Sequence, residues 1–273
     1  MNLEVISRTT AHASSNPPIV LIHGAWHGAW CWEDNFLEYF SQNGWEVHAV
    51  SLRGHGKSEG RRGLRWSSIS DYVDDLAQVV SSLDRPPILI GHSMGGLVTQ
   101  KYLERHTAAG AVLLASVPPS GTWRFNLRII RRHPIIWLTA NVLLWLYPIV
   151  QSPDLAREWF FSPGVTQDAI AKHHAQLQNE SYRAALDMLV LNLPRPALVD
   201  TPIAVLGGEN DQIFSVSEVV STAKAYGVEA KIFPAMAHNM MSEPEWKSVA
   251  AWILEWATSL SSDENSGHVQ ASG

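Results

Sequence analysis

The sequence predicts an α/β fold: a doubly wound, mostly parallel sheet with a helical cap inserted into it. Short apolar runs alternate with stretches of helical periodicity, which is the pattern of parallel strands buried on both faces. One run leads through a G-x-S-x-G turn into a helix, and the alternation stops over residues 118–201. The predicted strands are Ile19–Ile22, Val47–Leu52, Ile88–Ile90, Ala111–Ala115, Ile203–Leu206 and Ala230–Phe233.

The stretches between and after these runs carry apolar residues three and four positions apart, which gives each helix one face to pack on the sheet. The predicted helices are Trp32–Gln42, Ile69–Leu83, Leu97–His106, Val216–Tyr226 and Glu245–Ser259. In such sheets, ligands bind beyond the carboxyl ends of the strands. We therefore expect the chemistry directly after Ile22, Ile90, Leu206 and Phe233.

The composition is that of a globular protein with a sizeable core, since 46% of the 273 residues are hydrophobic and only 17% are charged. A formal net charge of −6 without a basic stripe argues against a nucleic-acid partner. The polar first fifteen residues lack the apolar core of a secretory signal, so we expect a cytoplasmic protein. The single cysteine, Cys31, excludes an intramolecular disulfide.

The predicted organisation is a sheet domain in two parts, residues 1–117 and 202–260, around a cap over residues 118–201. Proline recurs in the cap segment, and no stretch of it has the pattern of a strand. Residues 261–273 are polar, rich in serine and acidic residues, and without periodicity. We expect them to form a flexible tail.

An apolar stretch of the cap suggests two roles. Sixteen residues from Ile135 to Val150 carry no charge, which falls short of the ~20 needed to span a bilayer. The stretch is either an interfacial segment that contacts lipid or a cap helix packed over the active site, and the second interpretation is the simpler one. The first is suggested by four arginines that precede the stretch, Arg124, Arg128, Arg131 and Arg132.

The G-x-S-x-G turn places Ser93 between a predicted strand and a predicted helix. A serine in such an elbow has a strained backbone, and the strand and helix approach each other where a Cβ would clash. Gly91 and Gly95 supply the glycines that this geometry needs. Ser93 is therefore the candidate nucleophile.

A serine nucleophile needs a base to take its proton and an acid to orient the base. For an elbow serine these follow along the chain as acid and then histidine. The loop after the fifth predicted strand offers Asp211 and Glu209 as acids, which spacing alone does not separate. The loop after the sixth carries His238, and its position selects it as the base among twelve histidines.

The oxyanion formed on attack needs two N–H donors. The residue after the nucleophile supplies one, which gives Met94. The glycine-hinged turn after the first predicted strand supplies the other, from Ala25 or alternatively from Trp26. On this interpretation His23 orients the turn and takes no proton.

With these residues in place, the chain resembles the capped serine hydrolases of the α/β-hydrolase superfamily over about residues 20–260. Four motifs match in order: His23-Gly24-Ala25-Trp26, Arg53-Gly54-His55-Gly56-Lys57-Ser58, the elbow, and the paired acid and histidine loops. The resemblance implies that Asp211 is the acid, that Arg53–Ser58 is a structural turn, and that no cofactor or metal is needed. Serine at the elbow excludes the superfamily's dehalogenases and epoxide hydrolases, which carry aspartate there.

Two local features resemble different branches of the superfamily. Residues 54–63, followed by 71–76, resemble monoacylglycerol lipases and lysophospholipases, whereas residues 23–30 resemble small esterases and the plant methylesterase and hydroxynitrile-lyase group. The first signal implies a long lipophilic substrate and the second a small one.

Two histidines, His173 and His174, are neighbours in the sequence of the cap. They lack the i, i+4 spacing that would place two metal ligands on one face of a helix, so we expect no metal site there.

The leading hypothesis is an esterase or lipase-like serine hydrolase that cleaves a small-molecule carboxylic ester, with a lipophilic group held under the cap, through an acyl-enzyme. Alternatives on the same triad are carbon–carbon bond hydrolysis, thioester hydrolysis, hydroxynitrile-lyase or perhydrolase chemistry, and a small-molecule receptor. Aromatic residues offer candidate pocket walls. These are Trp26, Trp123, Trp137, Trp145 and Trp159.

Overall fold

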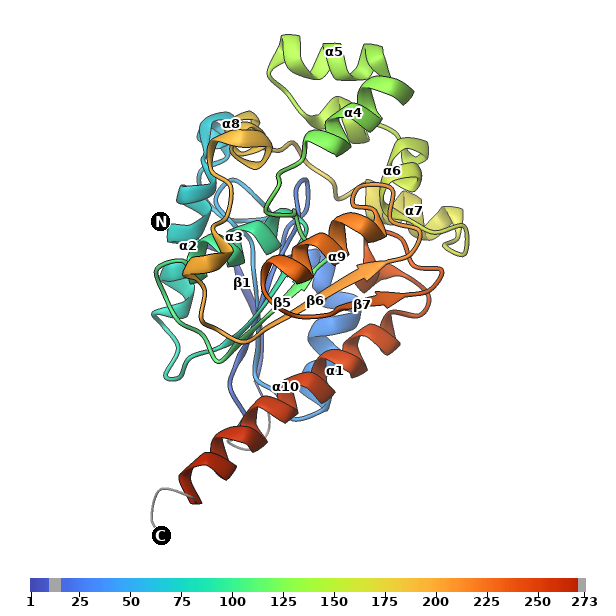
Figure 1. Ribbon diagram of the computed structural model, residues 1–273. Coiled ribbons are helices and arrows are strands. Elements are labelled where there is room, and N and C mark those ends of the chain that lie inside the picture. Colours follow the sequence, from blue (N-terminus) through green and yellow to red (C-terminus); the bar gives the residue numbers. More distant parts are fainter. Residues whose placement is uncertain (10–15, 270–273) are drawn as a thin grey trace.

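The computed structural model describes residues 1–9 and 16–269 and contains a seven-stranded sheet between layers of helices (Figure 1). The strand order is β1-β3-β2-β4-β5-β6-β7, and every neighbouring pair is parallel except β1 and β3. All six predicted strands are present, with ends shifted by at most two residues. The strands are β1 Val5–Arg8, β2 Ile19–Ile22, β3 Val47–Val50, β4 Ile88–His92, β5 Gly110–Leu114, β6 Ile203–Gly208 and β7 Ala230–Phe233.

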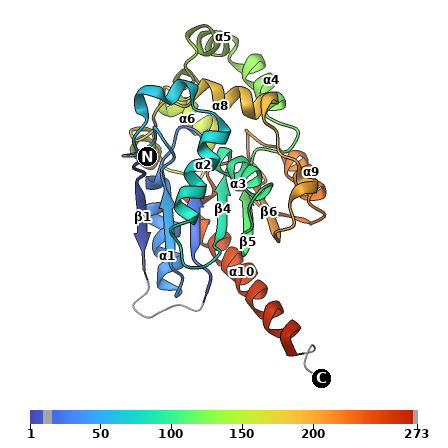
Figure 2. The same ribbon diagram turned by 90° about the vertical axis from the view of Figure 1, so that its left-hand side faces the viewer.

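The central strands are mostly apolar because both faces of the sheet are covered. Val20 and Ile22 of β2 pack into one core, while Ile19 and Leu21 pack into the other. Helices α2 (Ile69–Val80), α3 (Met94–Leu103) and α9 (Val216–Ala225) cover the first face, and α1 (Glu38–Gln42) and α10 (Trp246–Val269) cover the second (Figure 2). The alternating direction of side chains along a strand therefore serves two cores.

Strand β1 is the one strand that the sequence did not predict. It pairs antiparallel with β3 at the edge of the sheet, Val5 opposite Val50, and every second residue is exposed. An edge strand has one strand neighbour and buries little apolar surface, so its four residues lack the continuous apolar run that marks the others.

The chain between β5 and β6 contains helices and no strand over the described residues 115–202. These helices gather beyond one end of the sheet, where Figures 1 and 2 show them as a separate layer, and we call them the cap. They are α4 Trp123–Arg132, α5 Pro134–Leu143, η4 Tyr147–Val150, α6 Pro153–Phe160, α7 Gln167–His174, α8 Tyr182–Leu186, η5 Asp187–Leu191 and η6 Pro196–Leu198.

Helix α10 extends to Val269, through residues that the sequence assigns to a flexible tail. No proline follows Trp246 to break the helix, and its apolar first half packs on the sheet. Residues 270–273 lie outside the described part of the chain. Within that part, no helix is both long and apolar enough to cross a membrane.

The turn after β3 is tied down as the sequence predicts for a structural motif. The guanidinium of Arg53 donates to both carboxylate oxygens of the buried Asp75 of α2, and the Arg53 N–H donates to the same group at 2.8 Å. The ring of His55 bonds the Arg53 carbonyl through Nδ1 at 3.0 Å. This leaves His55 Nε2 pointing toward the cap, where it meets Glu180.

Candidate active site

Ser93 lies in the sharp turn between β4 and α3, with φ 52° and ψ −115°. This backbone conformation is strained for a residue with a side chain. Four main-chain hydrogen bonds hold it: the Ser93 N–H donates to the Leu114 carbonyl at 3.0 Å, and the Ser93 carbonyl accepts from Gly96, Leu97 and Val117. The strain is therefore built into the fold.

Two glycines let the elbow form. A Cβ at Gly95 would overlap the carbonyl oxygens of Ile22 and His23, and a Cβ at Gly91 would overlap the Gly95 carbonyl and Thr99. Helix α3 thus touches the end of β2 as well as its own strand. This contact brings the loop after β2 beside Ser93.

Asp211 and His238 meet at the ends of β6 and β7. Asp211 Oδ2 lies 2.8 Å from His238 Nδ1, and both side chains are buried. Asp211 Oδ1 accepts the N–H groups of Ile213 and Phe214, so the carboxylate is fixed in place. With Nδ1 engaged, the ring nitrogen left to serve Ser93 is Nε2.

Glu209, the competing acid, is exposed and accepts the N–H of Ala235 at 3.1 Å. Of the two candidates, the one that contacts His238 is Asp211. The loop of His238 in turn packs on the elbow, because its carbonyl lies 3.0 Å from His92 Nε2 and the two rings are 4.7 Å apart. In the described chain, Ser93 Oγ and His238 are not joined by a hydrogen bond, a contact that often forms only with substrate bound.

The loop after β2 runs past Ser93 and presents main-chain N–H groups. A Cβ on Gly24 would come within 3.0 Å of Ser93 Cβ, so the two segments are in close contact. The Trp26 N–H is occupied, since it donates to Glu180 Oε2 at 3.2 Å. The Ala25 N–H is not used in this way, and Met94 begins α3, where an N–H has no partner within its helix. Of the two alternatives for the loop donor, the geometry favours Ala25.

His23 is held as a neutral ring. Its Nδ1 lies 2.8 Å from the Gly24 carbonyl, and its Nε2 accepts the N–H of Leu52 at 3.1 Å. Burial and the nearby His55 lower the pKa of His23 well below its ordinary value. The ring therefore connects the loop after β2 to the end of β3 and is not placed to exchange protons with Ser93.

Two cap residues at this site were not predicted from the sequence. Glu180 is fully buried against the loop after β2, and His173 of α7 lies 2.9 Å from His27, Nε2 to Nε2. Asn239 Nδ2 is 3.2 Å from both of these nitrogens, and His27 Nδ1 is 2.6 Å from the Ala25 carbonyl. The partners come from distant segments, so no local pattern in the sequence marks them.

An apolar cavity of about 80 Å³ lies between the loop after β2 and the cap. Trp26 and Trp137, two of the five tryptophans expected to form the substrate pocket, line this cavity. Trp159 is buried against Phe125, a wall of the cavity, while Trp123 and Trp145 are partly exposed; none of the three belongs to the lining. Other apolar walls come from Phe125, Ile129, Ala140, Leu146, Ile149 and Met188. The lining also includes polar side chains, those of Thr122, Asn126, Asn141, Glu180 and Tyr182.

No cluster of three or more His, Cys, Asp or Glu side chains within residues 1–9 and 16–269 has the arrangement of a metal site. The histidines near Ser93 are engaged with main-chain carbonyls, with carboxylates or with each other.

Comparisons with known proteins agree with the fold. A family model described as "Serine aminopeptidase, S33" matches residues 14–245. The chain is 25% identical to the monoacylglycerol lipase of Mycolicibacterium smegmatis over 88% of each chain, and 39% identical to methyl jasmonate esterase 1 of Vitis vinifera over 32% of this chain and 33% of that one. The crystal structure of Paleococcus ferrophilus monoacylglycerol lipase superposes with a TM-score of 0.69 at 22% identity, covering 95% of this chain and 100% of that one.

The buried histidines predict an acid-sensitive fold. Burial lowers the pKa of His27 to about 4, whereas the unfolded chain holds it near 6.5. The unfolded state therefore binds more protons than the folded state between pH 6.5 and pH 4, so the free energy of unfolding falls as the pH is lowered through this range. The complete titration of His27 lowers it by about 3 kcal/mol. His23, His92 and His173 have pKa values lowered by burial and act in the same direction.

We expect His27→Gln to reduce the slope of unfolding free energy against pH by about 1 kcal/mol per pH unit between pH 6 and pH 5. Urea unfolding at several pH values measures this slope. The exposed His106→Gln is the control for loss of a histidine. A His27→Gln slope equal to that of the wild type would show that His27 is not held neutral.

Proposed function

The chain belongs to the serine aminopeptidase S33 family, a family of α/β-hydrolases, and we propose that it cleaves carboxylic esters through an acyl-enzyme formed on Ser93. The observation that carries this proposal is the hydrogen bond from His238 to Asp211 beside the strained Ser93. The names of its relatives, monoacylglycerol lipase and methyl jasmonate esterase, favour an ester over the other bonds that the same groups can break.

In the proposed mechanism, His238 Nε2 takes the Ser93 proton as Oγ attacks the ester carbonyl. Asp211 stays ionised, keeps the proton of His238 on Nδ1 and stabilises the imidazolium. The carbonyl oxygen becomes an oxyanion that accepts the N–H groups of Ala25 and Met94. Collapse breaks the ester bond, and the alcohol leaves with the proton from Nε2. Water then attacks the acyl-enzyme in the same way and releases the acid.

The apolar cavity under the cap supports a lipophilic substrate group. Ala25 belongs to its lining, so a chain that occupies the cavity lies next to the proposed oxyanion donor. Apolar walls with few polar groups are typical of sites for lipophilic ligands. At about 80 Å³ the cavity is small in this structure, and a long chain needs part of the cap to move.

For the triad, we expect Ser93→Ala and His238→Ala each to lower kcat by at least about 10⁴-fold, since members of such a triad act as a unit. Asp211→Asn should cost about 10³- to 10⁴-fold, because the wrong histidine tautomer is then favoured. Glu209→Gln is the matched control and should keep wild-type kcat. Hydrolysis of a p-nitrophenyl ester measures these rates, with circular dichroism to verify folding. Turnover in folded Ser93→Ala would contradict the proposal.

For the substrate, we expect hydrolysis of p-nitrophenyl esters from two to sixteen acyl carbons to peak at eight carbons or more. Ala140→Leu fills the cavity from α5 and should slow long esters more than the acetate. Val142→Leu, on the exposed side of α5, is the control. A wild-type peak at two to four carbons would contradict the lipophilic part of the proposal.

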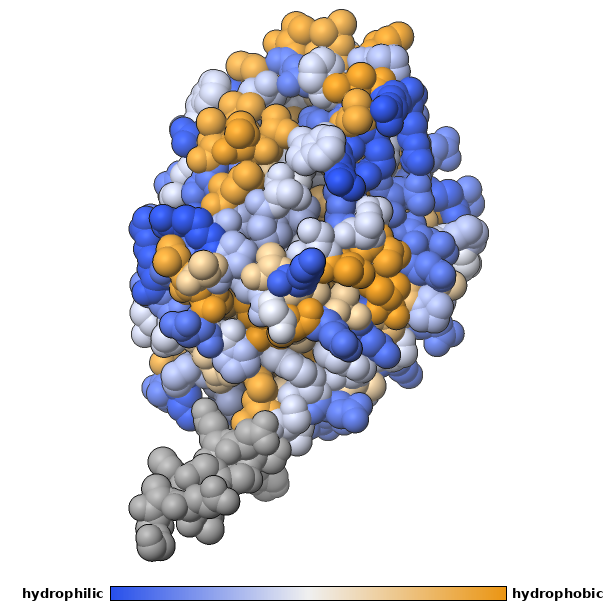
Figure 3. All heavy atoms as spheres, viewed as in Figure 1, coloured by the Kyte–Doolittle hydropathy of each residue, from blue (hydrophilic) through white to orange (hydrophobic). Residues whose placement is uncertain are grey.

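We further propose that the cap contacts lipid surfaces. Helix α5 covers the cavity with Trp137 and Ala140, while its opposite side exposes Ile135, Leu138 and Val142, with 77% of Ile135 accessible. This side forms the hydrophobic surface at the top of Figure 3. An exposed apolar patch on a helix is suited to an interface.

A neighbouring groove supports the lipid proposal. It has a volume of about 740 Å³ and combines arginines with exposed tryptophans, as the boundary between head groups and acyl chains requires. The Arg65 guanidinium lies 5.1 Å from the Trp145 ring. The groove's arginines and tryptophans are Arg61, Arg62, Arg65, Trp66 and Trp145.

The cytoplasmic location expected from the N-terminal residues stays a prediction.

We expect vesicles of anionic and zwitterionic phospholipid to sediment the wild-type protein. Leu138→Ser combined with Val142→Ser should reduce binding at least fivefold and leave hydrolysis of a soluble acetate ester unchanged, because both side chains face away from the cavity. Val220→Ser, an exposed apolar residue of α9, is the control. Equal sedimentation of the double variant and the wild type would contradict the proposal that the α5 surface binds lipid.

A further inference from the structure

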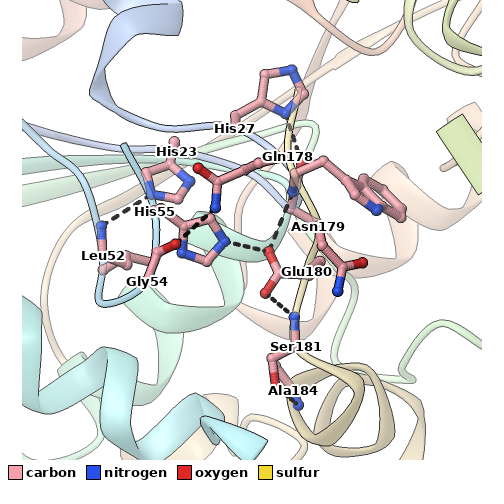
Figure 4. Close-up of polar contacts among 12 residues, drawn as sticks. His23, His27, Leu52, Gly54, His55, Gln178, Asn179, Glu180, Ser181 and Ala184 are labelled. Carbon is pink, nitrogen blue, oxygen red and sulfur yellow. Dashed lines mark hydrogen bonds and ion pairs between the residues drawn. The ribbon is translucent and has the colours of Figure 1, made fainter. Parts of the chain in front are cut away.

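A buried carboxylate of the cap touches the loop after β2. Glu180 has no exposed surface, and its two oxygens accept four hydrogen bonds. Oε1 accepts from Tyr72 Oη at 2.8 Å and from the Ser181 N–H at 2.6 Å, and Oε2 pairs with His55 Nε2 at 2.9 Å and accepts the Trp26 N–H at 3.2 Å. Figure 4 shows Glu180 between His55 and Ser181. Burying a charge is costly, so a group so fully paired calls for an explanation.

Two segments of the cap, residues 178–180 and Leu146 before η4, hold Trp26 at three points. Its N–H is bound by Glu180, its carbonyl accepts the Gln178 N–H at 3.1 Å, and its indole donates to the Leu146 carbonyl at 3.3 Å. Trp26 has a φ of 66°, in the left-handed region that a bulky residue rarely adopts. The cap therefore fixes an unfavourable backbone conformation directly after Ala25.

We propose that Glu180 is a positioning residue that assembles the oxyanion hole by binding the Trp26 N–H and so aiming the Ala25 N–H at Ser93. This inference rests on the proposed function. The plane of the peptide between Ala25 and Trp26 is set by the Trp26 N–H, and the Ala25 N–H is one peptide away. Without an acceptor at position 180, the loop can relax from the left-handed conformation, and the Ala25 N–H turns with it.

The charge of Glu180 strengthens this clamp. Burial alone would raise the pKa of Glu180, but the attraction of His55 and the hydrogen bonds it accepts lower it, so the carboxylate is ionised at neutral pH. A hydrogen bond to an ionised acceptor is about twice as strong as one between neutral groups. The amide of a glutamine at this position must present its NH₂ to one pair of donors, because each oxygen of Glu180 faces two.

The structure offers a matched control in the same segment. Asp187 is equally buried, and its Oδ2 accepts the N–H of Ile69 at 3.0 Å. It thus ties the cap to α2 as Glu180 ties it to the loop after β2, but it has no contact with Trp26. Each carboxylate also pairs with a basic side chain, Glu180 with His55 and Asp187 with Arg183 at 3.0 Å. Glu180→Gln and Asp187→Asn therefore each remove one buried, paired charge, and they affect different main-chain N–H groups, those of Trp26 and Ile69.

An alkylboronic acid tests the proposal, since Ser93 Oγ adds to its boron to give a tetrahedral boronate with an oxygen at the oxyanion position, which binds as a transition-state analogue. We expect Glu180→Gln to weaken boronate binding and to lower kcat about tenfold, with KM changed by less than threefold. Glu180→Ala should lower both kcat and boronate affinity about 100-fold. Asp187→Asn should lower the melting temperature and keep boronate affinity within twofold of the wild type.

The outcomes separate this inference from the proposed function. If the wild type binds no boronate, or if Ser93→Ala binds it equally well, the proposed function fails. If the wild type binds boronate through Ser93 and Glu180→Gln binds it equally tightly, the role of Glu180 is refuted. Equal losses in the Glu180 and Asp187 variants would likewise refute it, because they would indicate a general loss of packing. Should Glu180→Ala not fold, the Gln variant and its control decide.

Discussion

The site depends on the contact between α3 and the end of β2. Parallel pairing of β2 with β4 sets Ile22 opposite Gly91, so the loops that follow the two strands leave the sheet side by side. Gly95 then lets α3 press against the carbonyls of Ile22 and His23. A side chain there would force the helix away from the strand and separate the N–H of Met94 from that of Ala25. The strained conformation of Ser93 and the positions of the Met94 and Ala25 N–H groups therefore depend on the same helix–strand contact, and the remaining loops pack around it.

Much of this arrangement could be predicted from local sequence. Strands buried on both faces leave continuous apolar runs, and the elbow needs glycines at fixed positions, so local sequence predicts six of the seven strands and the turn that carries Ser93. Chain order pointed to His238, and resemblance chose Asp211 over Glu209, the choice that the 2.8 Å contact supports. Such signals are confined to a few neighbouring residues.

The residues that could not be predicted take their roles from distant partners. Glu180 meets Trp26 across 154 positions and His55 across 125. A lone glutamate in a cap without periodicity looks like any surface charge until the fold buries it. The aromatic residues of the cap have the same difficulty, since composition suggested five tryptophans for the pocket, but the orientation of each helix decides which side chains face it. Of the five tryptophans, Trp26 in the loop after β2 and Trp137 in α5 line the apolar cavity.

The cap has two parts with different attachments to the sheet domain. Residues 178–187 are fixed by buried polar contacts: Glu180 to the loop after β2, Ser181 Oγ to the Ser67 carbonyl at 2.6 Å, and Asp187 to Ile69. Helix α5, by contrast, packs on α4 and η4 and exposes its other side. Moving the first part would leave several buried donors and a charge without partners, which costs several kcal/mol. Moving α5 exchanges mainly apolar contacts and breaks two side-chain hydrogen bonds, from Trp137 Nε1 to Asn126 Oδ1 and from Tyr182 Oη to Asn141 Oδ1. Enlargement of the small cavity is therefore least costly at α5, and the loop after β2 can keep its contacts to Gln178 and Glu180 while it occurs.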